Sequence, residues 1–172
     1  MTDQKKKIFL FTIIIGSFTV YSLIYYSHVF KDAPYNFKEF KSFVFRYGAK
    51  DSMVNYFNST TGEHDYLNKK DSLIKSHLVL TTADLDSLHK AARSLGFWDF
   101  PNYELSADTT SDEGKHVPRY SIEFNYKRKV KHVLFDASFK GPDKLVDANK
   151  GMIKKIMDIL SNAEERQNKL HK

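Results

Sequence analysis

The sequence predicts an α+β fold in which an N-terminal transmembrane helix precedes an antiparallel sheet of order β-β-β-α-β-β-α, packed by two helices. Three observations support this prediction. A run of nineteen uncharged residues near the N-terminus is long enough to cross a bilayer. After it, hairpin patterns outnumber possible βαβ crossovers, which favours antiparallel pairing. Two further stretches have the apolar spacing of helices that bury one face.

The N-terminal run extends over residues 8–26 and spans about 28 Å as a helix at about 1.5 Å per residue. The basic side chains of Lys5 to Lys7 precede it, which predicts a cytoplasmic N-terminus under the positive-inside rule. We therefore expect two parts: a cytoplasmic tail and transmembrane anchor over residues 1–30, and an extracytoplasmic domain over residues 31–172. Phenol rings favour the membrane interface, and three tyrosines lie toward the far end of the run: Tyr21, Tyr25 and Tyr26.

Two alternatives to an uncleaved signal-anchor are a cleaved signal peptide and a buried helix of a soluble protein. A signal peptide usually has an apolar core of about 7–15 residues and small residues at its cleavage site. Residues 25–30 offer no such site. The pattern favours a single-pass protein of the cell membrane.

Composition restricts the class of protein further. A chain of 172 residues fits one domain, and its 15% aromatic content excludes a disordered chain. The absence of Cys excludes a disulfide scaffold, thiolate zinc sites, a Cys nucleophile and a lipid anchor on Cys. The net charge of +6 falls to +4 without residues 1–30, which weakens any case for binding nucleic acid.

Three strands are expected first, because apolar residues recur there at period two. They cover Lys41–Tyr47, Ser52–Asn58 and Leu73–Leu80, with a turn at residues 48–51 and a polar loop at Ser59–Lys70. Residues 31–40, before them, are a short juxtamembrane stretch.

A helix is expected to begin at Thr81, whose hydroxyl can cap it, and to stop at Gly96. The aromatic segment Phe97–Pro101 would hold that helix on the sheet. A long polar loop is expected over Asn102–Pro118.

The clearest strand is Arg119–Tyr126, where apolar and polar residues alternate. A charged turn and a returning strand, Val130–Phe135, complete a second hairpin. A final helix is expected from about Pro142, with a possible break at Gly151 and a polar tail from Glu164 that frays.

No catalytic constellation is apparent. The chain has no G-x-S-x-G element, no glycine-rich phosphate loop and no pair of His at i, i+4, so we expect no cofactor and no metal. His64-Asp65 could be a base with its orienter, but a solvated loop is the favoured interpretation. His77 and His132 could share a metal, but exposed strand residues are the favoured interpretation. The acidic residues lack the spacing of an EF-hand and favour a solvated loop: Asp99, Asp108, Asp112 and Glu113. These absences favour a non-enzymatic protein.

Two groups of side chains are candidate binding surfaces. Four aromatic residues could line a ligand or partner face of the sheet, the alternative being an aromatic core: Tyr120, Phe124, Tyr126 and Trp98. Three basic residues at the second hairpin turn could contact anionic lipid headgroups, the alternatives being a solvated turn or, less suitably outside the cytoplasm, nucleic acid: Lys127, Arg128 and Lys129.

The soluble part resembles small uncharacterised N-terminally anchored domains of bacterial envelopes. The resemblance covers about 100 residues through four stretches: Phe43–Tyr56, Leu80–Leu95, Phe97–Tyr103 and Tyr120–Phe135. Related domains often carry Cys near the first strand, and this chain has none. The resemblance transfers no catalytic residue to this chain.

The leading hypothesis is therefore a membrane-anchored protein, held by residues 8–26, whose extracytoplasmic domain binds an envelope protein or a ligand. One alternative is a small anchored hydrolase that uses His64 or His116 with Asp108 or Asp112. Another is an accessory subunit of a membrane complex, whose span packs on other helices at Gly16 and Ser17.

Overall fold

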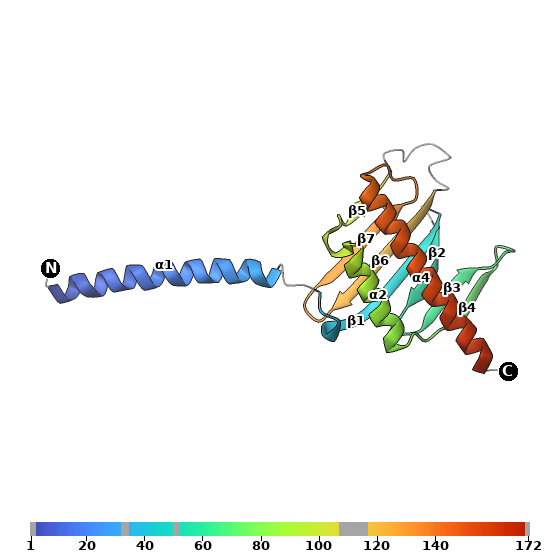
Figure 1. The fold of residues 1–172 in the computed structure, drawn as a ribbon, viewed down its shortest axis with the longest axis horizontal. Helices are drawn as coiled ribbons and strands as arrows, with labels where there is room; N and C mark the ends of the chain where they lie inside the picture. The colour runs from blue at the N-terminus through green and yellow to red at the C-terminus, as the bar shows by residue number, and fades with distance from the viewer. Residues whose placement is uncertain (1–2, 32–34, 50–51, 107–116, 171–172) are drawn as a thin grey trace. The chain divides into compact units, whose positions relative to one another are not determined.

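The computed structural model describes residues 3–31, 35–49, 52–106 and 117–170, which fall into two compact units. The first unit, residues 1–35, contains helix α1 (Asp3–Lys31). The second, residues 36–172, contains a mixed seven-stranded sheet and the helices that pack on it (Figure 1). The predicted α+β class and the N-terminal apolar helix are confirmed.

The sheet has the strand order β4-β3-β2-β1-β6-β7-β5. Neighbouring strands pair in antiparallel fashion except β5, which runs parallel to β7. The bounds are β1 (Phe40–Ala49), β2 (Ser52–Asn58), β3 (Glu63–Leu67), β4 (Leu73–His77), β5 (Tyr103–Glu104), β6 (Pro118–Tyr126) and β7 (Val130–Asp136).

Two long helices, α2 (Thr82–Ser94) and α4 (Asp143–Leu170), lie on the same face of the sheet (Figure 1). Two short 3-10 helices, η1 (Phe37–Glu39) and η2 (Phe97–Asp99), precede β1 and follow α2. Helix α4 is continuous through Gly151, so the predicted break is wrong, and the helix extends to Leu170.

Two strands differ from the sequence prediction. Residues 63–67 form β3 instead of a loop: their side chains alternate across the sheet, and His64, opposite Phe57, is buried. The two-residue strand β5 lies in the stretch predicted as a loop and makes the sheet mixed, not wholly antiparallel. The third predicted strand ends at His77, because the Leu78 amide donates to the carbonyl of Gly62 and not to a residue of a neighbouring strand.

The core is aromatic and lies between the sheet and the two helices. Apolar side chains at every second position of β1, β2, β6 and β7 point toward α2 and α4 and are fully buried: Phe43, Phe45, Phe57, Ile122, Phe124, Val133 and Phe135. The helices contribute Leu88, Ala92, Met152 and Ile156 from the spacing that faces the sheet.

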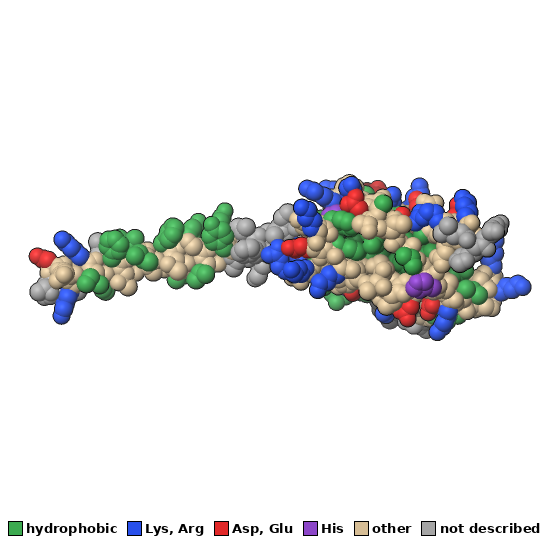
Figure 2. Space-filling view, turned by 90° about the horizontal axis from the view of Figure 1, so that it is seen from below, with side chains coloured by type: hydrophobic (Ala, Val, Ile, Leu, Met, Phe, Trp, Pro, Cys, Tyr) green, Lys and Arg blue, Asp and Glu red, His purple; other side chains and the backbone are tan. Residues whose placement is uncertain are grey.

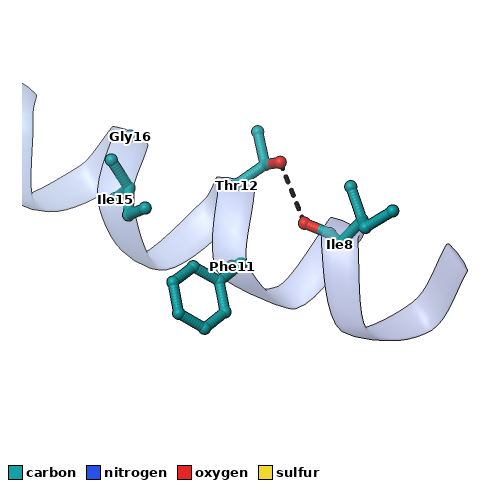
Figure 3. Close-up of a pocket in the computed structure, with 5 residues that line it drawn as sticks. All are labelled: Ile8, Phe11, Thr12, Ile15 and Gly16. Carbon is teal, nitrogen blue, oxygen red and sulfur yellow. Dashed lines mark hydrogen bonds between the residues drawn. The ribbon is translucent and has the colours of Figure 1, made fainter. Parts of the chain in front are cut away.

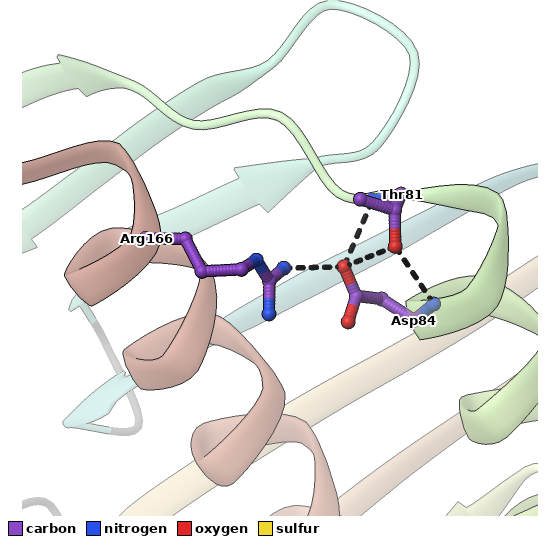
Figure 4. Close-up of polar contacts among 3 residues, drawn as sticks. All are labelled: Thr81, Asp84 and Arg166. Atoms are coloured by element: carbon purple, nitrogen blue, oxygen red, sulfur yellow. Dashed lines mark hydrogen bonds and ion pairs between the residues drawn. The ribbon is translucent and has the colours of Figure 1, made fainter. Parts of the chain in front are cut away.

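The start of α2 is capped as the sequence predicts, and the cap joins α4 (Figure 4). The Thr81 hydroxyl accepts the Asp84 amide at 3.2 Å, and Asp84 Oδ2 accepts the Thr81 amide at 2.9 Å, forming a capping box. Arg166 Nη2 donates to the same Asp84 oxygen at 2.5 Å, and Gln167 Nε2 donates to the carbonyl of His77 at 2.9 Å. These contacts hold the last turns of α4 against α2 and β4.

Candidate functional site

Helix α1 has an apolar surface that nothing in its own unit covers. Its segment Asp3–Tyr26 is long and apolar enough to cross a membrane, and none of it is buried. Large side chains from Ile8 to Tyr26 are more than half exposed. Figure 2 shows hydrophobic side chains along this helix and Lys side chains at its N-terminal end.

The hydroxyls within α1 bond to the helix backbone. Thr12 donates to the carbonyl of Ile8 at 2.9 Å, and Thr19 donates to that of Ile15 at 2.8 Å. Figure 3 shows the Thr12 bond beside a shallow hollow lined by Ile8, Phe11, Thr12, Ile15 and Gly16. Because these donors have partners within the helix, they can enter hydrocarbon at low cost.

The domain has a basic end, which we define as residues 36–41 and 126–130. Here η1 packs on the turn between β6 and β7. The Lys127 amide donates to the carbonyl of Glu39 at 2.8 Å, and Arg128 Nη2 lies 2.5 Å from Glu39 Oε1. The Tyr126 amide donates to the carbonyl of Lys129 at 2.9 Å and closes the turn.

Ring contacts fix the basic end to the core. Phe37 and Phe40 stack with centroids 5.5 Å apart, and Phe40 meets Tyr126 edge-on at 5.7 Å. Phe37 also lies 5.6 Å from the ring of His89 on α2. The basic end is therefore packed against the core of the domain.

The four aromatic residues predicted to bind a partner do not form one surface. Trp98 lies 5.2 Å from Phe124 and 5.9 Å from Tyr126, whereas Tyr120 stacks with Tyr47 at 6.2 Å near the other end of β6. Phe124 is 0% exposed and Tyr126 is 4% exposed, as the aromatic-core alternative expects. Their binding role stays a prediction.

Beneath the basic end lies a buried histidine. His89 Nδ1 is 2.7 Å from the hydroxyl of Tyr126, and its ring lies 5.4 Å from that of Trp98. Burial lowers the pKa of His89, and nearby Arg93 and Lys90 act in the same direction, against the opposing effect of Asp86. The neutral imidazole is the form that the folded domain favours.

We expect the free energy of unfolding to fall as the pH falls below about 6.5, the ordinary pKa of histidine. Below that pH, the unfolded chain binds a proton at His89 that the folded domain does not bind. The contribution of neutral His89 to the free energy of unfolding is therefore complete above that pH and is lost as the pH falls toward the lower folded pKa. His89→Gln should reduce the slope below about pH 6.5 in urea titrations followed by Trp98 fluorescence, and buried His64 should supply a remaining part of it. A variant that keeps the wild-type slope would contradict this assignment.

A second buried polar cluster joins β5, β7 and α4. Glu104 and Asn149 are both 0% exposed, and Asn149 Nδ2 donates to Glu104 Oε2 at 2.6 Å. Burial raises the pKa of Glu104, opposed by the Asn149 hydrogen bond and by Lys131. Burial lowers the pKa of Lys131, whose ammonium donates to the carbonyl of Phe100, while Asp99 and Glu104 oppose that shift. This cluster ties the short parallel strand to the sheet and the helix layer.

Sequence reasoning missed that cluster for a physical reason. Glu104 belongs to a strand too short to show a period, and Asn149 reads as one polar position among many on α4. Lys131 falls within the predicted strand Val130–Phe135, and it points to the helix-covered face with Val133. Only the pairing of β5 with β7 brings these residues together.

Among the predicted hydrolase residues, the structure describes His64 alone. His64 lies on β3 opposite Phe57, and its Nδ1 is 3.3 Å from the hydroxyl of Ser76. Burial lowers the pKa of His64, opposed by Glu164 and Asp65. Because adjacent strand residues face opposite sides, Asp65 does not orient His64.

The other predicted hydrolase and acidic-loop residues lie outside the described residues: Asp108, Asp112, Glu113 and His116. Over residues 3–31, 35–49, 52–106 and 117–170, no group of three His, Asp or Glu side chains is arranged to hold a metal ion. His77 and His132 are on β4 and β7, which four other strands separate in the sheet.

Comparisons with models of protein families, with curated proteins and with solved structures were made for the whole chain. None of them matches. A function is therefore inferred from the fold, from the apolar surface of α1 and from the basic end of the domain.

Proposed function

We propose that this protein is a single-pass membrane protein whose extracytoplasmic domain binds a partner protein or a ligand at the cell envelope. Residues 1–7 would lie in the cytoplasm, residues 8–26 of α1 would span the cell membrane, and residues 36–172 would lie outside. The observation that carries the proposal is the apolar surface of α1, which is entirely exposed within its unit.

The order of charges along α1 supports this orientation. Lys5 to Lys7 precede the apolar segment, and the phenols of Tyr21, Tyr25 and Tyr26 lie toward its other end. Lysines favour the cytoplasmic side, and tyrosines favour the boundary between lipid and water. An isolated amphipathic helix would instead show a charged face along its length.

The absence of Cys allows a direct test of orientation. Single cysteines are introduced by Thr2→Cys, before α1, and by Ser72→Cys, at the exposed turn between β3 and β4. Intact cells are treated with a membrane-impermeant maleimide. We expect S72C to be labelled in intact cells and T2C only after lysis.

Three outcomes would contradict the proposal. Labelling of T2C in intact cells would reverse the orientation. Protection of both variants until lysis would place the domain in the cytoplasm. A soluble product shortened by the mass of residues 1–30 would show a cleaved signal peptide.

A second candidate function is an accessory subunit of a membrane complex. The position of Gly16 favours it: beside the hollow that Thr12 also lines, this residue has no side chain to hold another helix away. Affinity capture of the full-length protein from solubilised membranes, beside a chain with an unrelated span, separates the two functions. A partner lost with the original span supports the accessory role, and one kept by both chains supports the binding domain.

A further inference from the structure

We propose that the basic end of the domain docks on anionic lipid headgroups of the membrane that holds α1. This inference rests on the proposed function, because it needs α1 in a bilayer. It adds a second contact with the membrane, made by residues of the folded domain. The partner of these residues is the layer of lipid phosphates.

The first argument is the distribution of charge. The basic end carries five Lys or Arg side chains and one Glu, a net charge of +4. The whole domain, residues 36–172, also has a net charge of +4, so the remainder has equal numbers of acidic and basic residues. Figure 2 shows Lys and Arg side chains gathered where the chain enters the domain. The five basic residues are Lys38, Lys41, Lys127, Arg128 and Lys129.

The second argument is that the fold assembles this charge from distant parts of the chain. Lys38 and Lys41 lie about 90 residues from the turn, and the bonds from Glu39 to Lys127 and Arg128 bring the two segments together. Lys38, Lys41 and Lys127 are exposed. Arg128 keeps a side chain that is 64% exposed despite its ion pair, so all four can meet a phosphate.

The third argument is the length of the chain between the two units. Helix α1 ends at Lys31 and η1 begins at Phe37. Six residue steps reach at most about 21 Å at about 3.5 Å per residue. If α1 spans the bilayer, the start of the domain cannot leave the headgroup region by more than this.

These properties fit a lipid surface better than a nucleic acid or a soluble acidic partner. Each basic side chain near an anionic surface contributes separately, and no shaped pocket is required. Proximity through the linker also raises the effective concentration of headgroups, so weak contacts suffice. Exposed apolar surface at Val130, which is 56% exposed, can enter the interface beside the lysines.

The test uses the full-length chain in nanodiscs of phosphatidylcholine alone and in nanodiscs that also contain phosphatidylglycerol. A neutral amine-reactive reagent labels lysines, and mass spectrometry gives the rate at each position. We expect Lys41 and Lys127 to be labelled several-fold more slowly in anionic nanodiscs at low salt. High salt should remove this protection by screening.

A matched pair of variants tests the location. Lys38→Gln with Lys127→Gln leaves the Arg128–Glu39 pair intact, while Lys69→Gln with Lys70→Gln removes the same charge from the exposed turn between β3 and β4. That turn lies at the opposite end of the strands. Each lysine near an anionic surface raises the ratio of docked to undocked domain about fivefold, so K38Q/K127Q should lower that ratio about 30-fold. The protection of Lys41 from labelling reports the ratio. K69Q/K70Q should leave it unchanged.

The outcomes separate this inference from the proposed function. A chain that stays in the nanodisc but is labelled equally in both lipids overturns docking and leaves the anchor standing. Equal effects of the two double variants also overturn docking, because net charge alone would then act. A chain that leaves the nanodisc overturns both.

Discussion

Two arginines in the middle of α1, Ile14→Arg and Phe18→Arg, are expected to release most of the protein from the membrane. Both native side chains are highly exposed, at 58% and 70%, and lie one turn apart on one face. Each Arg at the centre of a span costs about 2.5–3.5 kcal/mol on insertion scales. The pair costs about 6 kcal/mol, a factor of about 10⁴ in the insertion equilibrium. Alkaline carbonate extraction and flotation measure the fraction retained.

The matched control is Ile14→Leu with Phe18→Leu, which preserves an apolar surface. This variant should stay in the membrane fraction like the wild type. If the double Arg variant is also fully retained after carbonate extraction, α1 is not what holds the protein there.

The second large effect is expected for Asp136→Ala in the domain. Asp136 is 1% exposed and accepts from Arg119 Nε at 2.6 Å and from Arg119 Nη2 at 3.0 Å. It also accepts from the Ser106 amide at 3.1 Å. Removing the carboxylate takes an ion pair and two hydrogen bonds from a guanidinium that is only 15% exposed, which costs about 3–5 kcal/mol. The loss is measured by urea unfolding of the full-length protein, with Trp98, its one tryptophan, as the probe.

Glu39→Ala provides the comparison, since it breaks an ion pair of similar length at the surface. Arg128 and Glu39 keep side chains that are 64% and 27% exposed, so water replaces the lost partner. We expect a cost below about 1 kcal/mol. Equal losses for the two variants would contradict the importance of burial at Asp136.

The elements that the sequence predicted well are those with one buried face. Arg119–Tyr126 alternates strictly, and the observed strand begins one residue earlier, at Pro118. Thr81 caps α2 as expected, and Asp84 completes a capping box with it, because such a box is made by neighbours in the chain. A local pattern is enough where the contacts are local.

The remaining elements depend on contacts between distant residues. Strand β5 exists because Tyr103 and Glu104 reach β7 in parallel, and no period can reveal a strand of two residues. The turn at Lys127–Lys129 was recognised as basic, but its joining to Lys38 and Lys41 required the fold. The same holds for Glu104 and Asn149, which are 45 positions apart.

Strand β1 has a mechanical consequence. It is the first strand after α1, and it occupies the middle of the seven-stranded sheet, paired with β2 on one side and β6 on the other. Tension applied through α1 therefore enters the domain through its central strand. To pull β1 out, hydrogen bonds on both sides of its ten residues must break, whereas an edge strand would peel from one neighbour. A pulling force applied through α1 would therefore meet the sheet at a strand that is hydrogen-bonded on both sides.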